Sequence, residues 1–98
     1  MNIEFASGNL AGASVSFSEA SRLFGVPIGR QYIQRIAVLR AADKFGQLYG
    51  LSALRLHLLK GDRAGRYSVN LDENYRLIIE KVREDTVCII NVEDYHGN

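Results

Sequence analysis

The sequence predicts a single α+β domain, residues 1–98, in which two N-terminal helices pack on one face of an antiparallel meander sheet. Apolar residues recur at three- and four-residue spacing between positions 28 and 39, which is the period of an amphipathic helix. From residue 55 onward the period is two, as in strands, and short turns separate the segments. The 98 residues, 47% of them hydrophobic, are enough to bury one core.

The first part of the chain predicts a strand, a turn and a short helix. Residues 1–5 alternate apolar and polar side chains, as a half-buried strand does. The stretch 8–12 is rich in glycine and asparagine, so it predicts a turn. Ser16 or Ser18 can cap a helix that ends near Phe24, because a serine hydroxyl accepts a hydrogen bond from an unpartnered N–H of the first turn.

A second helix is predicted from Pro27 to about Ala42. Proline suits the first turn because its missing N–H would have no partner there. The apolar stripe of this helix, which we expect to be buried, consists of Ile28, Tyr32, Ile36 and Leu39. A last short turn covers residues 44–49, and Gly50 ends it.

The second half of the chain predicts four consecutive strands. They are expected at residues 55–59, 66–71, 75–80 and 86–92, with short connections between them. Short connections join antiparallel neighbours, so these strands form a meander. We expect the helices to cover one face of this sheet.

The charge of the chain is nearly balanced but unevenly distributed. The formal net charge is +1, which argues weakly against strong nucleic-acid binding. Between Arg55 and Arg66, however, the sequence has four cations and a single acid, Asp62, so the local net charge is 4 − 1 = +3. Such a patch can hold a phosphate, although a solvated, charged turn explains it equally well.

Composition argues against several classes of protein. Cys88 is the single cysteine and lies in an apolar run, where we expect a buried small side chain in a reduced, cytoplasmic protein. No leader and no apolar run of about 18 residues is present, so we expect neither export nor a membrane span. A metal site or other cofactor is not expected, because the histidines lie 39 positions apart and no glycine pattern fits a nucleotide loop.

Two histidines, His57 and His96, are the first candidates for chemistry. A pair of histidines can supply a general base and a general acid near neutral pH, and a meander could bring them together on one sheet face. Lys60 and Arg76 could stabilise a charged phosphorane. Tyr95 could serve as an alternative acid or stack on a base.

Asp94 is a further candidate, because a carboxylate can orient a histidine tautomer. Each of these residues also fits an ordinary structural role. A strand histidine is usually structural, a lysine before glycine usually belongs to a turn, and a tyrosine near the chain end usually packs. Spacing alone does not choose between these readings.

Three segments resemble HigB-like toxins of the RelE superfamily. The stretch Arg55-Leu-His-Leu-Leu-Lys-Gly, followed by a glycine-containing loop and Tyr67-Ser-Val, resembles a signature of that family. Asn74-Tyr-Arg-Leu-Ile and Asp94-Tyr-His resemble its next segment and its C-terminal catalytic run. They occur in the family's order and separation over residues 55–96. Leu58 stands where proline is frequent in the family, and Tyr67 stands where tryptophan is common.

The resemblance implies a RelE-like fold and a toxin of a type II toxin–antitoxin pair. It implies metal-independent endonucleolytic cleavage of mRNA, often on translating ribosomes. The partner that it implies is a HigA-like helix-turn-helix antitoxin, through which the pair would bind operator DNA. The catalytic residues that it implies are His57, Asp94, Tyr95 and His96. The RNA-binding and phosphate-binding residues that it implies are Arg55, Lys60, Arg66 and Arg76.

Two alternatives remain on sequence grounds. A ParE-like inhibitor of DNA gyrase would use the same superfamily fold for binding alone, and fold does not decide function. Such a protein does not need His57 or the Asp94-Tyr95-His96 end. A catalytically inactive toxin homologue could instead act through antitoxin and operator binding, which the modest net charge would allow.

Overall fold

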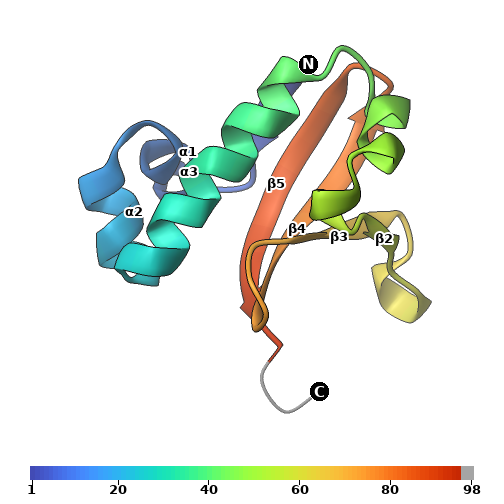
Figure 1. Cartoon of the computed structure of the whole chain (residues 1–98). Helices are drawn as coiled ribbons and strands as arrows, with labels where there is room; N and C mark the ends of the chain where they lie inside the picture. The colour runs from blue at the N-terminus through green and yellow to red at the C-terminus, as the bar shows by residue number, and fades with distance from the viewer. Residues whose placement is uncertain (96–98) are drawn as a thin grey trace.

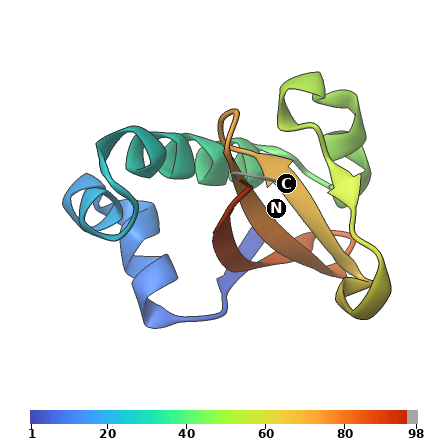
Figure 2. The ribbon, with the colours of Figure 1, turned by 90° about the horizontal axis from the view of Figure 1, so that it is seen from below.

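The structure, a computed structural model, describes residues 1–95 and contains a helical layer and one sheet (Figure 1). In both views, α1 and α2 lie at one side of the sheet and the loop between β2 and β3 lies at the other (Figures 1 and 2). The elements in chain order are β1 (Asn2–Phe5), α1 (Gly8–Val15), α2 (Phe17–Phe24), α3 (Val26–Ala41), η1 (Phe45–Gly50), η2 (Ser52–Leu54), β2 (His57–Leu58), η3 (Gly61–Arg63), β3 (Arg66–Asn70), β4 (Tyr75–Arg83) and β5 (Thr86–Asp94).

The sheet has five strands in the order β1-β5-β4-β3-β2. The last four strands are antiparallel neighbours in sequence order, as the predicted meander requires. The first strand corrects the prediction of a purely antiparallel sheet, because β1 pairs parallel to β5, with Asn2 opposite Thr86 and Phe5 opposite Ile89. The three helices lie between β1 and the meander in sequence, and they carry the chain from one edge of the sheet toward the other.

The core lies between the helices and one face of the sheet, so the predicted α+β class is confirmed. The predicted apolar stripe of α3 is buried, and Tyr32 and Leu39 have no exposed surface. This stripe belongs to one core cluster together with sheet residues Val69, Leu77, Ile79, Val87 and Ile89. Helix α3 begins and ends within one residue of the predicted bounds.

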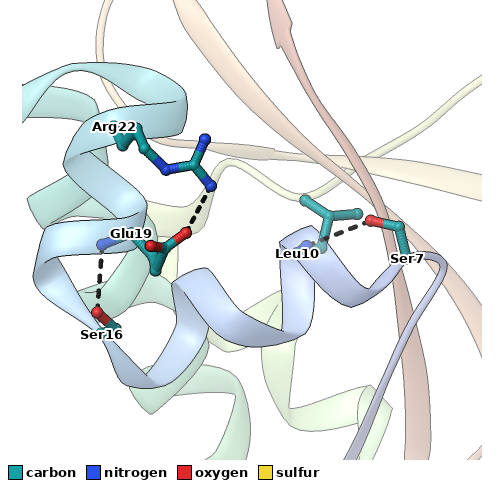
Figure 3. A network of polar contacts seen from close by, with 5 residues as sticks. All are labelled: Ser7, Leu10, Ser16, Glu19 and Arg22. Carbon is teal, nitrogen blue, oxygen red and sulfur yellow. Dashed lines mark hydrogen bonds and ion pairs between the residues drawn. The ribbon is translucent and has the colours of Figure 1, made fainter.

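Helix α1 was not predicted, since the sequence analysis expected a turn at residues 8–12. The Ser7 hydroxyl accepts a hydrogen bond of 3.2 Å from the Leu10 N–H, which caps the helix (Figure 3). Leu10 and Ala13 are buried against the core. Capping and burial together outweigh the low helix propensity of two glycines. The predicted Ser16 cap of α2 is confirmed by a bond of 3.2 Å from the Glu19 N–H.

Strand β2 is shorter than predicted. Only His57 and Leu58 pair with β3, whereas the sequence analysis expected a strand over residues 55–59. Arg55 has φ 46° and ψ 49°, and it is the one non-glycine residue among residues 1–95 with positive φ. A left-handed residue cannot continue a strand, so β2 begins only after Arg55. Strands β4 and β5 run further than predicted, to Arg83 and Asp94.

Candidate functional site

The candidate residues lie mainly on the sheet face that the helices leave uncovered, which we call the open face. Leu77 and Ile79 of β4 belong to the helix-side core, so Arg76 and Ile78 point to the opposite side. Residues paired across neighbouring strands share a face. The open face therefore carries three rows, which are Arg66–Glu80–Cys88, His57–Ser68–Ile78 and Asn70–Arg76–Glu93.

A β-bulge in β5 determines which residues near the chain end reach the open face. Ile78 pairs with Asn91 and Ile79 pairs with Ile89, so Ile90 is an extra residue in β5. Before the bulge, Val87 and Ile89 face the core, and strict alternation would send residues 91, 93 and 95 to the core as well. After the bulge Val92 packs against the core instead. Glu93 and Tyr95 therefore face the open side.

Arg76 is held at the centre of this arrangement by three groups. One of its terminal nitrogens donates hydrogen bonds of 2.7 Å to the Asp72 carbonyl and 3.1 Å to the Tyr75 carbonyl. Its guanidinium carbon lies 5.3 Å from the centroid of the Tyr95 ring, a cation–π contact. The Tyr95 N–H donates a hydrogen bond to the Asn74 carbonyl. These contacts fasten the end of β5 to the turn between β3 and β4.

His57 shares the open face with Arg76 but lies on the edge strand. It is exposed, β3 separates its strand from β4, and Arg76 lies two residues further along, so the two residues lie about 12 Å apart on the sheet. Lys60 follows at the start of the loop to β3 and is also exposed. Among residues 1–95, Lys60 forms no ion pair, so its charge is open to a ligand.

The other predicted cations differ in their surroundings. Arg66 lies 3.4 Å from the Glu80 carboxylate, and both side chains are more than two-fifths exposed. Such an exposed pair contributes little, so a phosphate can compete for Arg66. Arg55 and Arg35 line a shallow pocket beyond the end of β2. Arg35 donates a hydrogen bond of 2.7 Å to the Asn70 carbonyl, and the sequence analysis did not single it out.

Two predicted catalytic residues are placed differently from the rest. Asp94 pairs with Tyr75, which packs against the core, so the alternation of β5 directs Asp94 away from the open face. His96 lies outside the described residues. The open face is thus shared by His57, Arg76 and Tyr95, of which Arg76 and Tyr95 are in contact, and Lys60 lies at its edge.

Cys88 corrects one expectation. It is only partly buried, and it lies on the open face opposite Glu80 and Glu4 rather than in the core. Burial, with the charges of Glu4 and Glu80, raises the pKa of its thiol. Within residues 1–95, no group of three histidine, cysteine or acidic side chains could hold a metal ion. None of the helices in that part of the chain is long and apolar enough to cross a membrane.

Comparison with known proteins finds a similar sequence and a similar fold. No protein-family model matches the chain. It is 36% identical over 62 residues to the endoribonuclease HigB of Proteus vulgaris. The match covers 63% of this chain and 65% of that protein, which is slightly less than two thirds of its length. The YoeB/ParE toxin from Agrobacterium tumefaciens has the same fold, with a TM-score of 0.65 over 98% of this chain and all of that chain.

The chain is similar in sequence to HigB and has the fold of the YoeB/ParE toxin. The similarity to HigB rests on the sequence match. The structural match is only 12% identical in sequence, and it therefore shows the fold alone. His57, Arg76 and Tyr95 belong to the segments that resemble HigB-like toxins, and all three lie on the open face.

Proposed function

We propose that this HigB-like chain is the toxin of a type II toxin–antitoxin pair and acts as a metal-independent endoribonuclease on mRNA. The observation that carries the proposal is that His57, Arg76 and Tyr95 share one sheet face in a chain similar to the endoribonuclease HigB. This combination joins a titratable imidazole, a fixed cation and an aromatic ring. All three are useful on RNA and none is required by the core.

The proposed reaction is attack of an RNA 2′-oxygen on the adjacent phosphorus. A general base takes the 2′-OH proton, the P–O5′ bond breaks, and a general acid protonates the leaving 5′-oxygen. His57, Tyr95 and His96 are the candidate acid and base groups, and Asp94 is a candidate orienting group. Arg76 and Lys60 stabilise the charge that accumulates on the phosphorane.

The proposed substrate is mRNA bound in an extended form, in the setting of a translating ribosome. The candidate groups run across the open face from β2 to the end of β5, so a strand of RNA must cross the sheet to meet them all. The candidate backbone contacts are Arg66, beside Glu80, and Arg55, which lines a pocket with Arg35 of α3. The proposed partner is a HigA-like helix-turn-helix antitoxin, which would link the complex to operator DNA.

The experiment is induction of the chain alone in a bacterial host, followed by mapping of new 5′ ends on cellular mRNA. His57→Ala and His96→Ala test the site. Glu19→Gln serves as the matched control, because it removes a charge from an exposed ion pair on α2. Cuts that appear with the parent and with Glu19→Gln, and disappear with either histidine variant, support the proposal.

Two results would contradict it. One is growth arrest without new 5′ ends, together with inhibition of purified gyrase. This result would favour a ParE-like gyrase inhibitor, and ParE is part of the name of the structural relative. A folded chain that neither arrests growth nor cuts RNA would be an inactive homologue that acts through its partner.

A further inference from the structure

An ion pair connects the two ends of the candidate site, and its residues were not among the predicted site residues. A terminal nitrogen of Arg63 donates a hydrogen bond of 2.7 Å to a carboxylate oxygen of Glu93, across 30 residues of sequence. Both side chains are partly buried, with 37% and 28% of their surfaces exposed. Charge-assisted bonds of this length are among the stronger polar contacts in proteins.

The two partners belong to segments that carry different site residues. Arg63 ends η3, in the loop that begins at Lys60 and connects β2 with β3. Glu93 is the second-last residue of β5 and directly precedes Asp94 and Tyr95. The bond therefore crosses the open face from the loop that carries Lys60 to the strand end that carries Tyr95.

The loop itself has little else to fix it. Gly61 and Gly65 have φ of +71° and +90°, so the loop begins and ends at left-handed glycines. Lys60, Gly61, Asp62, Ala64 and Gly65 are all exposed, whereas Arg63 is partly buried. Two backbone hydrogen bonds of the loop, from the Ala64 N–H to the Gly61 carbonyl and from the Leu59 N–H to the Arg66 carbonyl, are local.

Burial on the open face agrees with a loop held down over it. Ser68 and Ile78 point to this face, yet they are 4% and 0% exposed. Ile78 is not part of the core cluster that the helices cover. Both residues lie in the row that His57 begins, next to the row that Glu93 ends.

We infer that Arg63 and Glu93 are positioning residues, which hold the Lys60 loop at a fixed place relative to the Tyr95 end of β5. The expected effect of this pair on cleavage rests on the proposed function, whereas its effect on the loop does not. A fixed loop keeps the Lys60 ammonium within reach of the phosphate that Arg76 contacts, and misplacement of such groups by about 1 Å can cost orders of magnitude in rate.

The test compares Arg63→Gln, Glu93→Gln and the exchanged pair Arg63→Glu with Glu93→Arg, in the purified chain. Amide hydrogen exchange of residues 60–65 is measured first, because it needs no RNA. Loss of the pair is expected to speed exchange in this loop about tenfold and to leave the amides of α3 unchanged. The exchanged pair is expected to restore slow exchange.

Cleavage of an mRNA under translation in a reconstituted bacterial reaction is measured second. Each single variant is expected to lower kcat about tenfold with little change in KM, and the exchanged pair to recover part of kcat. Glu19→Gln is the matched control, because it breaks an exposed ion pair with Arg22 remote from the open face and should change neither readout (Figure 3).

The outcomes separate the inference from the proposed function. Unchanged loop exchange in both single variants overturns the positioning role, whatever the RNA result. Faster loop exchange with parental kcat overturns the catalytic consequence. A parent chain that cuts no RNA overturns the proposed function, and faster exchange in its variants would then leave the pair as a loop clamp only.

Discussion

The hydroxyl of Tyr32 in α3 donates a hydrogen bond of 2.7 Å to the Leu10 carbonyl in α1, inside the core. The bond joins two helices whose residues are 22 positions apart. It satisfies both a buried phenol and a carbonyl of the short helix that the sequence analysis missed. Two consequences for stability follow from it.

The first prediction concerns removal of this hydroxyl. Tyr32→Phe keeps the ring and removes this buried hydrogen bond to the Leu10 carbonyl, so the free energy of unfolding is expected to fall by about 1–2 kcal/mol. Urea unfolding at neutral pH measures the change. Equal stability of variant and parent would mean that another donor replaces the hydroxyl.

The second prediction concerns alkaline pH. Burial raises the pKa of the Tyr32 phenol well above its ordinary value of 10. Since the unfolded phenol loses its proton at lower pH than the folded one, its contribution to stability is complete below about pH 10 and declines as the pH rises further. The free energy of unfolding of the parent, measured with urea, should therefore fall more steeply above about pH 10 than that of Tyr32→Phe. Parallel pH profiles would contradict this cause.

The third prediction concerns the contact between α2 and α3 at Gly29. A β-carbon there would lie 2.8 Å from the Ala20 carbonyl carbon and 2.9 Å from the Ser21 nitrogen, both backbone atoms. Gly29→Ala is therefore expected to lower the free energy of unfolding by about 1–3 kcal/mol. Gly12→Ala is the matched control, because nothing lies within 4 Å of its added carbon, and it should stabilise α1 by about 1 kcal/mol. Thermal unfolding of both variants, compared with the parent, measures these changes in stability.

The fourth prediction separates two roles of Tyr95. Tyr95→Phe keeps the ring against Arg76 and removes only the hydroxyl. If the hydroxyl is the general acid, kcat is expected to fall about 10²- to 10⁴-fold with unchanged RNA affinity. Tyr95→Ala should additionally weaken RNA binding. Parental cleavage by Tyr95→Phe would restrict Tyr95 to stacking, and His96 would become the first candidate for the acid.

The fifth prediction concerns the bulge. Deletion of Ile90 removes the extra residue of β5 and is expected to turn Glu93 and Tyr95 from the open face toward the helices. Cleavage should fall about 100-fold even where circular dichroism shows a folded chain. Ile90→Val keeps the residue count and should cleave like the parent. Full activity of the deletion variant would show that the bulge does not set the register of the site.

Much of the fold could be predicted because local patterns specify it. Tyr32, Ile36 and Leu39 repeat at helical spacing and are buried, and alternation located the strands of the meander. Helix α1 was missed because Gly8 and Gly12 outweighed the cap that Ser7 offers. The partner of β1 was beyond local reasoning, because Asn2 pairs with Thr86 at the other end of the chain.

The candidate site could be predicted only in part, for a related reason. The stretch Val87–Val92 is apolar at five of its six positions, so periodicity does not say which residue is extra. The side on which Tyr95 emerges, and the opposite placement of Asp94, depend on that residue. The Arg63–Glu93 bond joins segments 30 residues apart, and no spacing rule connects them. The predicted roles of His57, Lys60, Arg76, Tyr95 and His96 stay predictions until the variants are measured.

The parallel pairing of β1 with β5 also bears on the kinetics of folding. Helices α1 to α3 and the hairpins of the meander contain mostly local contacts, which can form early. The contact between Asn2 and Thr86 closes a loop of nearly the whole chain, and chain entropy delays such contacts. We therefore expect docking of β1 to be a late step. During synthesis, the sheet cannot be completed until its last strand, which Tyr95 directly follows, has left the ribosome that made it.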